Sequence, residues 1–147
     1  MGARRKGREL AVQALYQIEL SGGAAAGAMT AFWAQADAGE HAKEFAATLV
    51  AGVREQQPRI DTLITAATEH WRFERLSAVD LCVLRVATYE LLDAPRPPTS
   101  VVLDEAIEIA RRFGTGESSA FVNGVLDHIA AQLGVKEEAH EPGVRKE

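Results

Sequence analysis

The sequence predicts an all-α protein, a single-domain bundle of about seven helices. Apolar residues recur at helical spacing along the chain, and short breakers separate these stretches. No stretch shows the period-two alternation of β-branched residues that a half-buried strand needs. The chain has 147 residues, of which 47% are hydrophobic, so it can bury one core and one domain is expected.

The first half of the chain is expected to hold four helices. The first covers residues 4–20 and ends at the glycines that follow. A weaker helix is expected over residues 24–36 and a third over 40–57. Pro58 suits the first position of a fourth helix that runs to about residue 69, because its missing N–H would be unpaired there anyway.

The fifth helix is expected to form the core. Ser77 can cap it, and Asp80 places a carboxylate in its positively polarised first turn. Residues 79–92 are apolar on most sides, but Asp80, Arg85 and Thr88 fall on one arc of about 140°. This arc predicts that one edge of the helix reaches the surface.

Prolines and glycines delimit the last two helices. The connector at 94–98 holds three prolines and is interpreted as a rigid spacer rather than as a PxxP ligand. A sixth helix is expected over 100–113, with Gly114 as a left-handed terminator, and a seventh over 118–133. The helical domain therefore covers residues 1–134, and residues 135–147 form a charged, flexible tail.

The basic residues are unevenly placed. The net charge is −5, which argues against a partner as anionic as nucleic acid. Four cations nevertheless precede the first acid, Glu9, and they are Arg4, Arg5, Lys6 and Arg8. The rest of the chain carries twelve positive and twenty-one negative charges, a net charge of −9. A basic tip on an acidic body is the pattern expected of a local nucleic-acid contact.

These four cations also oppose the helix that they begin. A helix N-terminus carries partial positive charge, so each cation in the first turns costs roughly 0.3 kcal/mol or more. Such a penalty without structural compensation is expected where function imposes it, and a polyanion would compensate it. Arg4 and Arg8 are i, i+4 neighbours that could straddle one phosphate path. From the charge pattern alone, a solvated tail stays the alternative.

Catalytic and metal-binding chemistry finds no support in the sequence. No two histidines share the i, i+4 spacing of a helical zinc site. Cys82, the single cysteine, is expected to be a buried thiol, and Asp104, Glu105 and Glu108 are expected to form a solvated helical face. We therefore expect no metal, no cofactor and no enzymatic activity. Without a long apolar run or a secretory leader, a cytoplasmic protein that does not contact a membrane is expected.

Three stretches of the sequence resemble the NusB family. Residues 3–16, ARRKGRELAVQALY, resemble the family's arginine-rich opening and the Ala-Val-Gln-Ala-Leu-Tyr that follows it. Residues 84–91, LRVATYEL, look like its central helix. EAIEIA at 105–110, then Phe-Gly at 113–114 and FVNGVLD at 121–127, resemble its last two helices. Together the stretches span most of the chain in the family's order.

The resemblance implies a bundle in two packed subdomains that acts in transcription antitermination. Proteins of this family pair with the ribosomal protein NusE, bind the boxA element of nascent ribosomal RNA, and act on RNA polymerase with other Nus factors. The RNA-binding surface that the resemblance implies consists of Arg4, Arg5, Lys6, Arg8, Arg85, Glu117 and Phe121. Phe121 has two interpretations, a ring that stacks on a base and a ring in the core.

The NusE-binding surface implied by the resemblance consists of Tyr16, Glu74 and Asp80. Asp80 therefore has two interpretations, a partner contact and a helix-start charge. The chain departs from the family at Glu117, where Asp is common nearby, and in the Gly- and Ala-rich stretch 22–28. These departures leave the RNA sequence preference open.

Two other functions stay open at this point. NusB-like domains also occur at the N-terminus of certain RNA cytosine methyltransferases. That function would require a further Rossmann-like domain with a cysteine nucleophile, which this chain is expected to lack. Alternatively, the basic first helix could pack against a second copy of the chain, giving a homodimeric interaction module.

Overall fold

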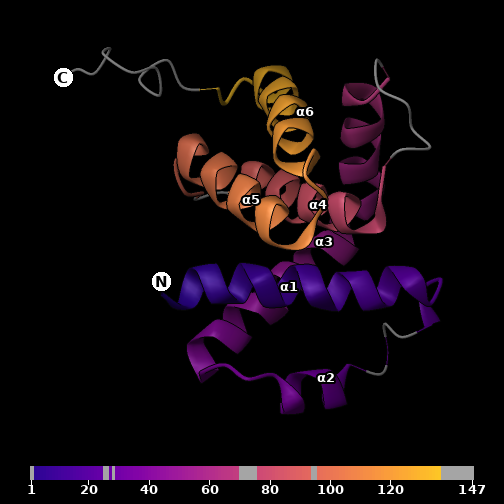
Figure 1. Cartoon of the computed structure of the whole chain (residues 1–147), viewed down its shortest axis with the longest axis vertical. Coiled ribbons are helices and arrows are strands. Elements are labelled where there is room, and N and C mark those ends of the chain that lie inside the picture. The colour runs from indigo at the N-terminus through magenta and orange to yellow at the C-terminus, as the bar shows by residue number, and fades with distance from the viewer. Residues whose placement is uncertain (1, 25–26, 28, 70–75, 94–95, 137–147) are drawn as a thin grey trace.

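The computed structural model describes residues 2–24, 27, 29–69, 76–93 and 96–136. Within these ranges the chain forms six α-helices and no strand, which confirms the predicted all-α class (Figure 1). The helices are α1 (Ala3–Leu20), α2 (Thr30–Gln35), α3 (Glu40–Ala67), α4 (Ala78–Leu92), α5 (Thr99–Phe113) and α6 (Ser118–Leu133).

The third and fourth predicted helices, residues 40–57 and 58–69, form one kinked helix, α3. Gln56 leaves helical geometry, at φ −104° and ψ 15°, two residues before Pro58. Pro58 has no N–H to donate to the preceding turn, and its ring crowds the carbonyl there, so the helix bends. The helix continues past the bend because apolar side chains on both sides of it are buried, namely Leu49, Val53, Ile60 and Ile64.

Two further helix boundaries differ from the prediction. The second helix, expected over 24–36, covers Thr30–Gln35 among the described residues, and residues 25, 26 and 28 of the expected range lie outside them. Gly114 ends α5 in an extended conformation, with φ −97° and ψ −162°, and not in the left-handed region. A Cβ at Gly114 would collide with the side chain of Ser118, so close approach explains this glycine. The left-handed cap is Gly134, at φ 73°, after α6.

Helix α4 forms the centre of the core. Residues 82–91 are all buried, and α4 contacts α1, α3, α5 and α6. Ser77 caps the helix as predicted, since its Oγ accepts a hydrogen bond from the backbone N–H of Asp80 at 3.0 Å. The predicted exposed edge is wrong, because Asp80, Arg85 and Thr88 are all buried.

The other helices pack around α4 in two groups. Helix α1 packs along α3 on one side, and α5 packs on α6 on the other. Figure 1 shows α1 and α2 in one half of the molecule and α5 and α6 in the other, in agreement with two packed subdomains. The N-terminal ends of α1 and α5 lie at the same end of the bundle, at the left of the view. No helix in the described part of the chain is long and apolar enough to cross a membrane.

Candidate nucleic-acid interface

The four cations of the basic tip, Arg4, Arg5, Lys6 and Arg8, lie in the first two turns of α1 but differ in exposure. The helix has Gly2 as its N-cap residue, with no side-chain cap and no acid in its first turn. Arg4 is exposed, whereas Arg5 and Lys6 are half-buried. Arg8 is only 4% exposed. The basic tip therefore presents some of its charge to solvent and buries the rest.

Arg8 belongs to a buried ion pair. Its Nε and Nη2 donate to the two carboxylate oxygens of Glu90 on α4, at 2.7 and 2.9 Å. Its Nη1 lies 4.0 Å from Oε1 of Glu105 on α5. The expectation that Arg4 and Arg8 flank one phosphate path does not hold, because Arg8 points into the helix packing and is already paired with a carboxylate.

Arg5 is paired with Glu105 at the surface. Nε and Nη2 of Arg5 donate to Oε1 and Oε2 of Glu105 at 3.0 and 2.8 Å. The hydrogen bonds raise the pKa of Arg5 and lower the pKa of Glu105, so both groups are charged at neutral pH. The prediction that Glu105 lies on a solvated face is wrong, because its side chain turns toward α1 and is 16% exposed. The carboxylate of Glu105 thus offsets part of the unfavourable interaction between the cations at the start of α1 and the positive end of the helix dipole.

Arg4 stacks on an aromatic ring of α3. Its guanidinium carbon lies 4.5 Å from the centre of the Phe45 ring, and that of Arg8 lies 5.4 Å from the same centre. Gly7 leaves room for this ring, since a Cβ there would lie 2.7 Å from Cδ2 of Phe45 and 3.0 Å from the carbonyl oxygen of Ala42. The glycine within the arginine-rich segment is therefore explained by the packing of α1 on α3.

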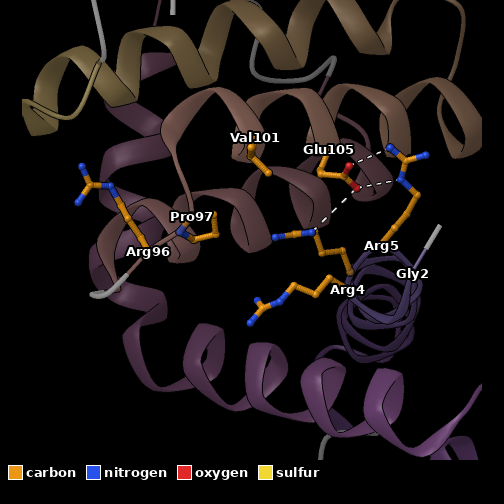
Figure 2. A pocket seen from close by; sticks show the side chains of 8 residues that line it. Gly2, Arg4, Arg5, Arg96, Pro97, Val101 and Glu105 are labelled. Carbon is orange, nitrogen blue, oxygen red and sulfur yellow. Dashed lines mark hydrogen bonds and ion pairs between the residues drawn. The ribbon is translucent and has the colours of Figure 1, made fainter. Parts of the chain in front are cut away.

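An open hollow of about 600 Å³, the arginine hollow, lies where the N-terminal ends of α1 and α5 meet (Figure 2). Its lining residues are Gly2, Arg4, Arg5, Arg8, Arg96, Pro97, Val101 and Glu105. Figure 2 shows Arg5 turned toward Glu105, whereas Arg4 extends from α1 and Arg96 lies on the side away from α1. Four guanidinium groups around one hollow create a local positive potential in an acidic chain.

Arg85 lies near the other end of α1 and is not exposed as predicted. Its Nε and Nη2 donate to the two oxygens of Asp61 on α3, each at 2.9 Å, and its Nη1 donates to Glu19 on α1 at 2.8 Å. Burial lowers the pKa of Arg85, but these hydrogen bonds outweigh burial and the pKa is raised overall. Arg85, which is 8% exposed, thus ties α4 to α1 and α3.

Phe121 and Glu117 lie at the start of α6. Glu117 is the N-cap residue of the helix and is exposed. Phe121 is half-buried and packs against the hydrophobic core with part of its ring. Its position is therefore intermediate between a core ring and a surface ring. Neither residue lines the arginine hollow.

Tyr16, which the resemblance assigns to the NusE surface, lines a second depression, the apolar groove, of about 480 Å³. The residues around it are Val12, Gln13, Tyr16, Gln17, Leu20, Phe32, Val79 and Phe113. Leu20 is 63% exposed, which is unusual for a large apolar side chain in this molecule. A surface depression with these side chains has the character of a protein-binding surface.

The other two residues assigned to that surface are Asp80 and Glu74. Asp80 is 6% exposed and sits in the first turn of α4 beside the Ser77 cap, which supports its interpretation as a helix-start charge. Its Oδ1 accepts no hydrogen bond within the described residues. Its neighbour Val79 lines the apolar groove. Glu74 lies outside the described residues.

Sequence reasoning missed several residues that shape the site. They are Phe45, Glu90, Arg96 and Arg112, of which Arg112 donates to Glu9 at 2.7 Å and so joins α5 to α1. One signal was available, because Arg8 falls on the buried stripe of α1 at i, i+3 and i+7 with Ala11 and Leu15. A cation at such a position indicates an internal partner.

The remaining candidate chemistry of the site is ionic. No three His, Cys, Asp or Glu side chains in the described ranges are grouped so that they could hold a metal ion. Cys82 is buried, and burial raises the pKa of its thiol to about 12, so it stays protonated at neutral pH. The geometry of the described residues around the hollow is that of a charged binding surface.

Comparison with known proteins identifies the family. The sequence profile of the NusB family matches residues 5–131. The chain is 47% identical to the transcription antitermination protein NusB of Geobacter sulfurreducens and 44% identical to that of Sorangium cellulosum, over 90% and 91% of this chain and 97% and 96% of theirs. The structure is similar to that of T. maritima NusB, with a TM-score of 0.78 and 42% identity over 88% of this chain and 91% of that one. The chain therefore belongs to the NusB family.

Proposed function

We propose that this chain is an RNA-binding transcription antitermination factor and not an enzyme. The names of its relatives support the antitermination role. The observation that carries RNA binding is the arginine hollow, which gathers four guanidinium groups in a chain whose net charge is −5. A local excess of positive charge on an acidic protein suits a polyanion such as RNA, whose phosphates bind arginine by charge-assisted hydrogen bonds.

The cations divide into two roles under this proposal. Arg4, Arg5 and Lys6 contact the RNA backbone, because they are exposed or half-buried. Arg8 and Arg85 hold helices together, since each is paired with carboxylates inside the molecule. Glu117 and Phe121 extend the RNA surface at the start of α6, where the accessible part of the Phe121 ring stacks on an unpaired base.

The RNA that we propose is boxA of nascent ribosomal RNA, and the partner is the ribosomal protein NusE. NusE docks on the apolar groove around Tyr16, with Glu74 and Asp80 at or near its border. The pair then acts on RNA polymerase together with other Nus factors, in the cytoplasm. A homodimer through the same surfaces is the competing assembly, and light scattering with and without RNA would detect it.

Titration of a labelled boxA RNA at two salt concentrations tests RNA binding. Replacing Arg4, Arg5 and Lys6 together with Ala should weaken binding at least about tenfold and reduce the salt slope by about two, because each phosphate contact on a single strand contributes about 0.7. The matched control replaces three exposed cations elsewhere, Arg54, Arg59 and Lys136, with Ala. Equal binding by the two triple variants would refute the proposed RNA surface.

The partner is tested separately, with purified NusE. Adding NusE should tighten boxA binding by the wild-type chain. Tyr16→Ala should remove that gain and leave the binding of RNA alone unchanged, because Tyr16 lines the apolar groove and not the arginine hollow. A Tyr16→Ala variant that still responds to NusE in full would exclude the groove as its docking surface.

A further inference from the structure

The arginine hollow has two walls that come from distant parts of the chain. One wall is the start of α1, with Arg4 and Arg5. The other is the segment that leads into α5, with Arg96, Pro97 and Val101. Figure 2 shows Arg96 across the hollow from Arg5, and its side chain does not join the network of ion pairs around Glu105. The second wall lies outside the arginine-rich segment that the sequence singled out.

The charges in the hollow are unequally compensated. Arg8 is paired with Glu90, and Arg5 is paired with Glu105. Arg4 and Arg96 have no carboxylate partner among the residues that the structure describes. Arg4 rests instead on the ring of Phe45, which orients its guanidinium without neutralising it. The uncompensated positive charge of the hollow therefore lies on one arginine from each wall.

The wall that carries Arg96 also offers apolar surface. Val101 is 40% exposed, and Pro97 lies beside it in the lining of the hollow. A depression of about 600 Å³ with cations at its border and apolar groups on one side can hold one nucleotide unit of a strand. Successive phosphates of the strand would contact the guanidinium groups at the border, and the ribose and base would lie against Val101 and Pro97.

We propose that Arg96 is a second-wall RNA contact, which binds a backbone phosphate of the RNA strand that also contacts Arg4. This inference rests on the proposed RNA-binding function and adds to it a contact outside α1. Because phosphates carry no sequence information, the contact supports affinity for any single strand that enters the hollow. Its contribution is the same for boxA RNA and for a scrambled RNA of equal composition.

The test compares Arg96→Ala with Arg111→Ala. Arg111 is a matched control, because its side chain is 61% exposed and lies at the other end of α5, paired with Glu108. Both labelled RNAs, boxA and scrambled, are titrated at several salt concentrations. Arg96→Ala should weaken both by about three- to tenfold and reduce the salt slope by about 0.7, whereas Arg111→Ala should match the wild-type chain. Arg96→Lys should restore most of the salt slope, because it keeps the charge.

The outcomes separate this inference from the function on which it rests. If the wild-type chain binds RNA and Arg96→Ala binds as tightly as Arg111→Ala, the second-wall contact is overturned and the proposed function stands. If the wild-type chain binds neither boxA RNA nor the scrambled RNA, the proposed function itself is refuted. A loss of affinity for boxA alone would also overturn the inference, since a phosphate contact acts on both RNAs. Thermal unfolding of Arg96→Ala at the wild-type temperature shows that any loss arises in the folded state.

Discussion

At the N-terminal end of α1, Arg4 and Arg5 border an open hollow, whereas at its C-terminal end Glu19 and Asp61 enclose Arg85. At the C-terminal end, the single guanidinium group of Arg85 donates hydrogen bonds to two carboxylates. At the other end, four guanidinium groups border the hollow, and two of them, those of Arg5 and Arg8, are paired with the carboxylates of Glu105 and Glu90. The same residue type thus joins helices at one end and leaves excess charge at the other, and the number of carboxylates within reach decides which.

Arg8 shows that both roles occur within the basic tip itself. It follows Arg5 by one helical turn, but it is buried against Glu90 while Arg5 stays at the surface. A structural arginine inside the proposed RNA-binding segment means that a loss of binding after mutation can have two causes, lost contacts and lost folding. Measurements of stability separate them.

The largest expected effect is on folding and comes from Arg8→Ala. Removing this cation leaves Glu90 buried without a partner, which costs about 3–5 kcal/mol of unfolding free energy. Urea unfolding measures the loss. The control is Arg4→Ala, which removes an exposed cation–π contact and should cost about 0.5 kcal/mol. Similar losses for the two variants would contradict the division into a structural and a binding arginine.

Arg85→Ala should have a smaller effect on stability. Its carboxylate partners Asp61 and Glu19 are 36% and 39% exposed, so both regain water when the guanidinium is removed. The charged hydrogen bonds lost are worth about 1.5–3 kcal/mol in total under these conditions. RNA affinity of the folded variant should stay within about twofold of wild type, since no phosphate contact is lost. A loss of RNA affinity as large as the one that Arg4→Ala causes would place Arg85 on the RNA surface.

The sequence predicted the helices with strong periodicity and clear caps. Helices α1, α4, α5 and α6 lie within a few residues of their predicted ranges, because apolar spacing and the Ser77 cap are local signals. The predicted interruption near Pro58 is confirmed as a kink at Gln56, but the two parts form one helix, because buried side chains on both sides of the kink keep it continuous. Tertiary packing there outweighs the local preference of proline.

The basic tip was also predicted from sequence, but the division of labour within it was not. Arg5 is separated by 100 residues from Glu105, and Arg8 by 82 residues from Glu90. Neither pairing follows from spacing along one helix. Arg96 was missed for a similar reason, because it reaches the hollow only once α5 packs beside α1. Ion pairs between distant elements decide which cations a partner can reach, and local sequence patterns do not contain them.

The smallest effect expected on folding, and the one that distinguishes the hollow from the Arg85 cluster, comes from Glu105→Gln. Under the proposed function, this change removes a carboxylate that would compete with RNA phosphate for Arg5. RNA affinity should therefore rise, by about two- to fivefold at low salt. The free energy of unfolding should fall only slightly, and by less than for Arg85→Ala, because Arg5 is 38% exposed and the pair is screened by water. Weaker RNA binding would instead mean that Glu105 orients Arg5 for phosphate.

The pH dependence of stability identifies the Arg5–Glu105 pair as the cause. Arg5 lowers the pKa of Glu105 in the folded chain below its ordinary value of 4.5. The unfolded chain then binds more protons than the folded chain as the pH falls through this range, so the stabilisation by the pair is present above about pH 5 and is lost in acid. Urea unfolding of wild type and Glu105→Gln should therefore differ at pH 7, and the difference should shrink as the pH falls below 4.5. A difference that stays constant with pH would show that the glutamine alters packing and not the ion pair.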